Sequence, residues 1–291
     1  MKIVVTTPTG NIGSRVVQLL IQAGIRPTVL ARKPERLSSA VIAASDVLQG
    51  DLTDQDFVLE STRDADALFW LIPSDYDSDD MLGDIARLGE QAAQAIQKNR
   101  IGRTVFLSSG GAERRDETLI GALGKVEDRL NETGANILHL RPDYLFTNLF
   151  MNLEEIRQGI LVTTVPLDKA TGWNDPRDVG DIAATWLLNS QWTGQRIQAI
   201  HGPEDLTFAD VARILGEAVG REVQALQVSE EEARTAMLDA GMRGPGVDEL
   251  LALSRSVAAG DEPDPGRGFV STTPTTLGAW CYANLRPALQ N

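Results

Sequence analysis

The sequence predicts an α/β fold with a doubly wound parallel sheet, followed by a smaller, mostly helical C-terminal cap. Three observations predict it. Up to residue 142, short β-branched runs alternate with amphipathic stretches, as in parallel strands that are connected by helices. A loop with two glycines follows the first run, at the place where such folds bind phosphate groups. From residue 202 onward the periodicity is mainly helical.

Six strands are expected before residue 142, as in a doubly wound dinucleotide-binding sheet. They cover residues 2–7, 27–32, 46–51, 66–73, 103–109 and 136–142. The amphipathic runs between them predict helices at 11–24, 81–99 and 124–134. The chain then returns to the sheet with a helix at 178–189 and a strand at 195–200.

The composition is that of a soluble globular protein. Hydrophobic residues make up 42% of the 291 residues, and no apolar run reaches the roughly 18 residues that cross a bilayer. The chain starts with a strand-like run instead of an export-signal pattern, and Cys281 is the single cysteine, so a cytoplasmic location is expected. A net charge of −14 disfavours nucleic-acid binding, and two isolated histidines predict no metal site.

Residues 5–13, VTTPTGNIG, form the candidate phosphate loop. Gly10 is placed to let the backbone approach a pyrophosphate, and Gly13 to let helix and strand pack closely. Thr7 occupies the turn position that usually holds glycine, which a side chain tolerates if the backbone keeps a negative φ. A helix that begins at Asn11 would present free N–H groups to the pyrophosphate. The alternative is that the glycines only permit close packing.

The second expected strand ends in Ala31, Arg32 and Lys33. An NAD-binding protein carries an acid here for the ribose diol, whereas the planar guanidinium of Arg32 suits the 2′-phosphate of NADP. Lys33 adds a second positive charge, although a solvated basic pair at a helix start is the alternative. Asp51, which closes the third strand, borders the adenine or forms a turn or helix cap. The sequence therefore favours NADP(H).

Two domains are expected. The dinucleotide-binding domain covers 1–142, with 175–201 returning to the sheet, and the substrate-binding cap covers 143–174 and 202–291. Helices are expected in the cap at 207–220 and 229–241, and the Gly/Pro/Asp-rich stretch 258–268 is expected to be a mobile loop. The cap covers the carboxyl edge of the sheet, where ligands bind in this fold.

Several motifs together resemble one family. They are TPTGNIG at the start, ARKPERL, GDLTD and FLSSGGA after the second, third and fifth expected strands, LRPDYLFTNL, and the helical stretch 202–242. The chain resembles the NmrA-like branch of the atypical short-chain dehydrogenase/reductases, and its second half is most similar to triarylmethane-dye, quinone and iminium reductases. The helical C-terminal pattern is the narrower signal, because the early motifs occur across the superfamily.

The resemblance implies a Rossmann domain that binds NADP(H) and a cap that binds an apolar or cationic small molecule. The residues expected at the cofactor are Thr7, Thr9, Gly10, Asn11, Ile12, Gly13, Arg32, Lys33, Asp51, Leu52, Leu71, Ile72, Pro73, Ser108 and Lys125. Those expected at the substrate are Asp75, Ser109, Tyr144, Phe146 and Asn148. A homodimer is compatible with the family.

The chain departs from the superfamily at its catalytic pair. Typical members carry Tyr-x-x-x-Lys on the helix that here reads TLIGALGKVEDRL. If Lys125 is the lysine, Gly121 stands at the tyrosine position; an alternative register places Leu119 and Leu123 at the two positions. Neither register contains a tyrosine. Lys125 either still reaches the cofactor ribose or lies on an exposed helix face.

Without that acid, ketone reduction is disfavoured, because the alkoxide must be protonated as hydride arrives. A cationic carbon, an iminium or a quinone needs less help. Asp75 and the acidic loop 73–81 are expected to attract a cation, or else to form a solvated turn. Tyr144 is the remaining candidate for the catalytic proton donor or a stacking surface, with a packed aromatic as the alternative.

The expected function is hydride transfer from NADPH to a conjugated or cationic acceptor. The alternative is a non-enzymatic redox sensor that binds NADP(H) and acts through a protein partner. An epimerase or lyase on the same fold is disfavoured, because such enzymes generally need the tyrosine as well.

Overall fold

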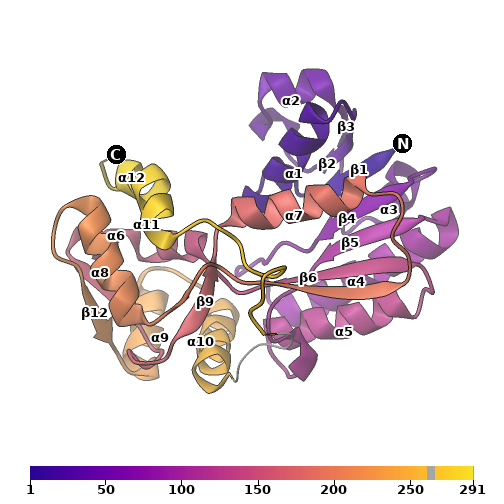
Figure 1. Cartoon of the computed structure of the whole chain (residues 1–291). Helices are drawn as coiled ribbons and strands as arrows, with labels where there is room; N and C mark the ends of the chain where they lie inside the picture. The colour runs from indigo at the N-terminus through magenta and orange to yellow at the C-terminus, as the bar shows by residue number, and fades with distance from the viewer. Residues whose placement is uncertain (261–265, 291) are drawn as a thin grey trace. The chain divides into compact units, whose positions relative to one another are not determined.

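The computed structural model describes residues 1–260 and 266–290 as two compact units (Figure 1). Unit 1 contains residues 1–74, 82–141 and 179–198, and unit 2 contains residues 75–81, 142–178 and 199–291. The acidic segment 75–81 thus packs with unit 2, whereas the sequence placed it in the dinucleotide-binding domain. Part of the loop expected at 258–268 lies outside the described residues.

The sheet of unit 1 has seven strands in the order β10-β6-β5-β4-β1-β2-β3. They are β1 (Ile3–Thr6), β2 (Thr28–Ala31), β3 (Asp46–Gln49), β4 (Ala67–Leu71), β5 (Arg103–Leu107), β6 (Asn136–Pro142) and β10 (Gln195–Ile200). Strands β1 to β6 pair in parallel, with register partners such as Val5 with Val29 and Val5 with Phe69. All six strands expected before residue 142 are present, and the strand expected at 195–200 is the edge strand β10.

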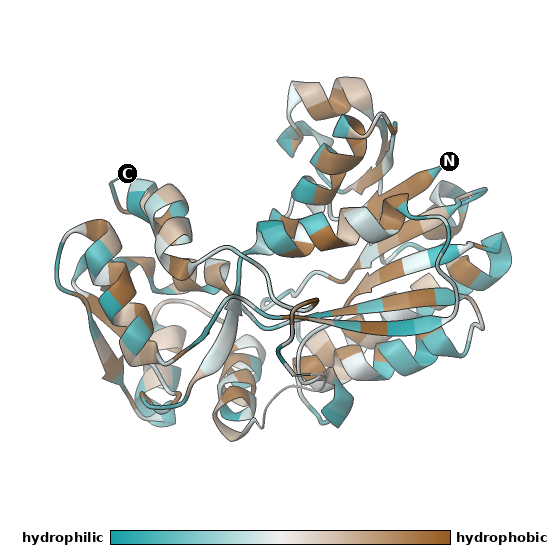
Figure 2. Ribbon diagram, in the orientation of Figure 1, coloured by the Kyte–Doolittle hydropathy of each residue, from teal (hydrophilic) through white to brown (hydrophobic). Residues whose placement is uncertain are grey.

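The inner strands are apolar and buried because helices cover both faces of the sheet, whereas the edge strands β3 and β10 are more polar and more exposed. Every residue of β1 and β2 is buried, and brown residues dominate the strand beside the N label in Figure 2. In Figure 1 the helices α1 and α7 lie on one side of the sheet and α4 and α5 on the other. The helices and 3₁₀ turns of this unit are α1 (Asn11–Gln22), η1 (Pro34–Arg36), α2 (Ser39–Ala44), α3 (Gln55–Ser61), α4 (Met81–Asn99), η2 (Ala112–Arg114), α5 (Leu119–Asn131) and α7 (Pro176–Leu188).

Unit 2 has its own core and two small sheets, β11-β9-β7 and β12-β8. Its strands are β7 (Tyr144–Leu145), β8 (Ile160–Thr163), β9 (Thr171–Asn174), β11 (Asp205–Leu206) and β12 (Gln224–Gln227). Its helical elements are η3 (Phe146–Asn152), α6 (Leu153–Arg157), α8 (Phe208–Val219), α9 (Glu230–Asp239), α10 (Gly244–Ala259), α11 (Leu277–Trp280), η4 (Cys281–Leu285) and α12 (Arg286–Gln290). Thr207 and Ser229 begin α8 and α9 with capping boxes, at the starts that the sequence predicted. The short sheets were not predicted, because two- and four-residue strands carry little periodicity.

None of the described helices is long and apolar enough to cross a membrane. Cys281 is fully buried, and burial raises the pKa of its thiol to about 12, so it packs as an apolar residue.

His139 on β6 is buried in the core of unit 1. Its ring packs edge-on against Phe106, Nε2 lies 2.9 Å from Asn131 Oδ1, and Nδ1 has no hydrogen-bond partner in the described chain. Burial lowers the pKa of His139 to about 4. The imidazole is therefore neutral in the folded protein at neutral pH.

This burial predicts a loss of stability in mild acid. Because the pKa of His139 is about 4 when folded and 6.5 ordinarily, the unfolded chain takes up the proton first, and stability falls as pH drops from 6.5 toward 4. Between pH 7 and pH 5 the free energy of unfolding should fall by about 2 kcal/mol from this group. Urea titrations of the wild type and of His139→Gln measure it, and a slope that is equally steep in the variant would contradict it.

Candidate functional site

The phosphate loop lies between β1 and α1 in unit 1. Helix α1 begins at Asn11, as predicted, with Gly10 as its N-cap. No side chain caps the helix, and its first turn holds no acid, so its N–H groups remain available to an anion. Gly10 and Asn11 are exposed, whereas Ile12 and Gly13 are buried against the sheet. The local geometry is that of an anion site at a helix N-terminus.

Gly13 is required by close packing. A Cβ at this position would overlap the carbonyl oxygen of Thr7, so the first turn of α1 contacts the backbone of the loop directly. A Cβ at Gly10 would meet that same oxygen at 3.5 Å, an ordinary contact. The two glycines therefore differ: Gly13 maintains the fold, while Gly10 leaves the surface of the loop open.

Thr7 corrects one expectation. The sequence argument required a negative φ at this position, but Thr7 has φ 50 and lies in the left-handed region. The turn needs this conformation because the carbonyl oxygen of Thr7 accepts a 3.1 Å hydrogen bond from the Gly10 N–H. A β-branched residue is strained there, at a cost of about 1–3 kcal/mol. Its hydroxyl is buried without a hydrogen-bond partner among the described residues.

The ends of β2 and β3 lie side by side. Arg32 and Lys33 follow β2, both are exposed, and neither forms an ion pair within the described parts of the chain. Gln49 Nε2 donates to the carbonyl oxygen of Arg32 at 3.4 Å. The Asp51 carboxylate accepts from Thr53 N at 2.9 Å and Thr53 Oγ1 at 2.8 Å, and so forms a turn. Two unpaired cations thus stand at this edge of an acidic protein.

The end of β4 is tied to the start of the phosphate loop. Leu71 N donates to Thr6 Oγ1 at 2.9 Å, which holds the segment Leu71–Pro73 beside β1. Ile72 is buried, whereas Pro73 and Thr9 are exposed. At the end of β5, Ser108 is buried, and its hydroxyl has no hydrogen-bond partner in the part of the chain that the structure describes. Ser109 Oγ donates to the carbonyl oxygen of Gly110 at 3.1 Å.

Taken together, unit 1 brings most of the expected cofactor residues to the carboxyl ends of neighbouring parallel strands. Those that share this edge are Thr7, Thr9, Gly10, Asn11, Ile12, Gly13, Arg32, Lys33, Asp51, Leu52, Leu71, Ile72, Pro73 and Ser108. Their contact with a cofactor stays a prediction.

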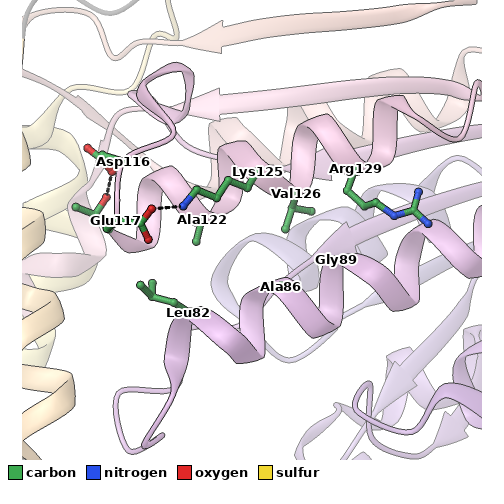
Figure 3. Close-up of a pocket in the computed structure, with 10 residues that line it drawn as sticks. Leu82, Ala86, Gly89, Asp116, Glu117, Ala122, Lys125, Val126 and Arg129 are labelled. Atoms are coloured by element: carbon green, nitrogen blue, oxygen red, sulfur yellow. Dashed lines mark hydrogen bonds and ion pairs between the residues drawn. The ribbon is translucent and has the colours of Figure 1, made fainter.

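Lys125 forms an ion pair with an acidic residue of the chain. It is half-exposed and its Nζ lies 2.6 Å from Glu117 Oε1. Figure 3 shows the two residues at a pocket between α4 and α5, with Val126 next to Lys125 on α5 and with Leu82 and Ala86 below them on α4. The volume of this pocket is about 320 Å³. A ribose contact by Lys125 stays a prediction, and this ion pair does not support it.

The position of the superfamily's tyrosine has no room for a side chain. In the register that uses Lys125 this position is Gly121, and a Cβ there would overlap the backbone nitrogen and oxygen of Asp116. Gly124 packs in the same way on the carbonyl oxygen of Ala112. The segment from Ala112 to Asp116 thus lies directly on the N-terminal half of α5.

A buried ion pair stands on the inner face of α5, where the motifs predicted no functional residue. Glu127 and Arg141 are 1% and 4% exposed, and Arg141 donates to both carboxylate oxygens, at 2.9 and 2.6 Å. Burial opposes ionisation of Glu127, but the hydrogen bond from Arg141 and the positive charge of that guanidinium outweigh it and hold the pKa of Glu127 below its usual range. The sequence signal that could have indicated this pair was Arg141, a charged residue directly after the apolar run NILHL.

The expected substrate residues lie in unit 2, apart from Ser109. Tyr144 packs on Trp173, with ring centroids 4.5 Å apart, and its hydroxyl interacts with the Asn148 side chain. Burial raises the pKa of Tyr144 to about 12, so the phenol stays protonated. Phe146 is only 1% exposed and belongs to the core of the unit.

The acidic segment of unit 2 is held by backbone and ion-pair contacts. Asp75 Oδ1 accepts from Asp77 N at 3.1 Å, which is the turn-forming alternative. Asp79 pairs with Arg243, whose guanidinium also donates to the carbonyl oxygen of Asp77. Within residues 1–260 and 266–290, no three His, Cys, Asp or Glu side chains are grouped to hold a metal ion.

The comparisons with known proteins agree on the family and the fold. The model of the NmrA-like family matches residues 1–254. An NAD(P)H azoreductase from Xenophilus azovorans is 26% identical over 281 residues, which covers 95% of this chain and 93% of that protein.

Three solved structures share the fold at low identity. A nucleoside-diphosphate-sugar epimerase from Staphylococcus aureus has a TM-score of 0.79 and 18% identity, and covers 97% of this chain and 100% of its own. The Citrobacter sp. triphenylmethane reductase complexed with NADP(H) has a TM-score of 0.76 and 19% identity, with coverages of 95% and 98%. The Escherichia coli NADPH-dependent quinone oxidoreductase QOR2 complexed with NADPH has a TM-score of 0.77 and 18% identity, with coverages of 98% and 99%.

The two loop glycines should respond differently to alanine. Gly13→Ala inserts a methyl group into backbone and should lower the free energy of unfolding by about 1–3 kcal/mol. Gly10→Ala, the matched control, changes only an exposed N-cap and should cost less than about 1 kcal/mol. Urea unfolding of the ligand-free proteins measures both values. Equal losses in the two variants would show that the close contact at Gly13 does not exist.

Proposed function

The chain belongs to the NmrA-like family, and on that premise we propose that it is an NADPH-dependent reductase of conjugated or cationic small molecules. Two observations at the carboxyl edge of the doubly wound sheet carry the proposal: within the described residues Arg32, which follows β2, has no ion-pair partner, and no side chain caps the N-terminus of α1, which follows β1. The azoreductase, triphenylmethane reductase and quinone oxidoreductase named above support it, because each is a reductase that is similar to this chain.

The residues present fit a phosphorylated dinucleotide. Gly10 leaves its backbone open beside the N–H groups of α1, which suits a pyrophosphate. Arg32 and Lys33 have no acid partner among the described residues, so their charges are available to a 2′-phosphate. Asp51 satisfies Thr53 and leaves the ribose diol of NAD without a dedicated acid. When bound, NADPH supplies the hydride.

The class of acceptor follows from the available proton donors. Helix α5 offers no tyrosine, and the segment Ala112–Asp116 fills the space at Gly121. A raised pKa makes Tyr144 a weak acid, able to donate a hydrogen bond but slow to release its proton. A ketone would therefore lack efficient protonation, whereas a cation becomes neutral as it accepts hydride. A conjugated acceptor such as a quinone spreads the charge over its ring.

The remaining substrate residues are assigned on the same basis. We propose that the Tyr144 hydroxyl and the Asn148 amide hydrogen-bond the acceptor, because both groups belong to one polar cluster. Ser108 is proposed as a contact near the reacting carbon, since its buried hydroxyl makes no hydrogen bond of ordinary length within the described residues. Asp75 is a weaker candidate, because its carboxylate already closes a turn.

The first test concerns the cofactor. The protein should bind NADPH more tightly than NADH, and Arg32→Ala should remove most of that preference, because one charged contact to phosphate contributes about 1.5–3 kcal/mol, or roughly tenfold to a hundredfold in Kd. Glu35→Ala, which alters the same turn without removing a cation, is the control. Titration calorimetry gives the six affinities of the three proteins, and equal Kd values for NADPH and NADH in the wild type would refute the role of Arg32.

The second test concerns the acceptor. Triarylmethane-like cations, iminium ions and quinones should be reduced, whereas simple ketones should react about 10²- to 10⁴-fold more slowly for lack of a positioned acid. Lys125→Ala should change kcat by less than about threefold, because Lys125 already pairs with Glu117. NADPH oxidation followed at 340 nm measures each rate. Efficient turnover of a ketone would assign the proton to another group, most plausibly Tyr144, and tight binding without any turnover would favour the sensor.

A further inference from the structure

The inner face of α5 carries a charged group that the proposed function does not use. Glu127 is the most deeply buried acid of this helix, and the two hydrogen bonds from Arg141 occupy both of its oxygens. Isolated charges are expensive to bury, and a buried ion pair often adds no stability over an apolar pair of the same size. Stability alone is therefore a poor explanation for this pair.

The pair is connected to the segment that follows β5. Arg141 also donates from Nη1 to Glu113 Oε2 at 3.0 Å. Arg115 lies 3.4 Å from Glu127 Oε2, pairs with Asp128 at 2.7 and 3.0 Å, and donates to the carbonyl oxygen of Ala112 at 2.7 Å. Both arginines therefore join residues 112–115 to α5 and β6. We call these five charged residues, Glu113, Arg115, Glu127, Asp128 and Arg141, the clamp.

The segment needs such support because its backbone is not in a relaxed conformation. Gly111 has φ 85, and Arg115 has φ 50, which is unfavourable for a residue with a side chain. No side chain separates the segment from α5, since Gly121 and Gly124 contact its backbone directly. The arginine contacts hold residues 112–116 flat on the helix at the place where a tyrosine would otherwise project.

The same segment begins at Ser108. The Ser108 N–H donates to the carbonyl oxygen of Leu140 at 2.8 Å, which fixes its backbone to β6 next to Arg141. Its hydroxyl makes no hydrogen bond of ordinary length among the described residues, but it lies close enough to Glu127 to help stabilise the carboxylate. Helix α5 thus directs Glu127, and not Lys125, toward the end of β5.

We propose that Glu127 is a positioning residue, whose contacts with Arg141 and Arg115 hold the segment from Ser108 to Asp116 in the conformation that the reductase reaction requires. This role rests on the proposed function for its catalytic consequence. It takes the place that the Tyr/Lys pair has on this helix in the wider superfamily, but Glu127 itself does not touch the reacting atoms. A clamp of this kind fixes where Ser108 stands and leaves proton transfer to other groups.

The test compares Glu127→Gln with Glu90→Gln. Glutamine keeps the volume of Glu127 and removes its charge. The control removes the charge from a different ion pair of α5, Glu90 on α4 with Arg129 at 2.6 Å, which no described contact connects to the segment. Hydrogen exchange should become faster across residues 108–116 in Glu127→Gln and stay unchanged there in Glu90→Gln. This readout needs neither cofactor nor substrate.

Kinetics supply the second readout. In Glu127→Gln, kcat with a quinone acceptor should fall about tenfold to a hundredfold, because small displacements of positioning groups have effects of that size. The KM for NADPH should stay within about twofold, since the phosphate loop and Arg32 are untouched. A merely structural role would lower the melting temperature without this split between kcat and KM.

The outcomes separate the two proposals. Unchanged exchange and unchanged kcat in Glu127→Gln would overturn the clamp. Absence of turnover in the wild type would overturn the proposed function, and the exchange measurement would still decide whether the clamp exists. If Glu127→Gln fails to fold, Glu113→Gln replaces it, because this partly exposed residue ties the segment to Arg141 without entering the buried pair. Faster exchange at 108–116 in Glu113→Gln supports the clamp, and unchanged exchange overturns it.

Discussion

The constraint on which unit 1 depends is direct contact between two backbones. At Gly13 the first turn of α1 rests on the carbonyl oxygen of Thr7, and at Gly121 and Gly124 the helix α5 rests on the segment 112–116. Each contact exists only because no Cβ is present. The first brings the N–H groups of α1 to the edge of the sheet, and the second closes the space beside α5. The same kind of contact thus leaves the N–H groups of α1 available to an anion and, in the register that uses Lys125, leaves no room for a side chain at the tyrosine position.

Local positive charges oppose the negative net charge of the whole chain. A net charge of −14 repels anions at long range, so binding of a dinucleotide must depend on short-range groups. Arg32 and Lys33 meet this condition because they stand unpaired within the described residues, whereas the clamp pairs its two arginines with three acids. Cations without partners can serve a ligand, while cations with partners fix the backbone.

Most of the fold and about half of the site could be predicted from the sequence, and the reasons differ by residue. The six N-terminal strands and the capped helices α8 and α9 follow from patterns within ten or so residues, and so does the placement of Gly10 and Arg32. The φ of Thr7 could not be predicted, because it is imposed by the packing of α1 rather than by the residue. For Lys125 the exposed helix face was one of the two alternatives, but its ion pair with Glu117 could not be predicted, because it depends on where Glu117 lies after a turn.

Long-range contacts explain the remaining failures. Segment 75–81 was expected in the first domain because it follows β4 in the sequence. Arg243, about 165 positions later, binds the Asp77 carbonyl oxygen and the Asp79 carboxylate, and the segment packs with unit 2. No functional role was predicted for Glu127 and Arg141, because each looks ordinary alone: a helix contains many glutamates, and an arginine often ends a strand. The two residues are 14 positions apart in the sequence, and their interaction can be recognised only in the folded chain, where they form hydrogen bonds and both side chains are buried.

The chemistry available to the proposed reductase follows from two properties, the raised pKa of Tyr144 and the lack of a tyrosine in the sequence of α5. In a reductase with a tyrosine acid, the tyrosine protonates the acceptor as hydride arrives. Such an enzyme can therefore reduce acceptors that would otherwise become anionic. Here burial raises the pKa of Tyr144 to about 12, so its phenol holds its proton. An acceptor that is already positively charged, or that spreads its new charge over a conjugated system, removes the need for a strong acid. In the proposed reaction the acceptor, and not an acid of the protein, therefore accommodates the charge that hydride transfer creates, and for this reason we propose cations and conjugated rings as acceptors.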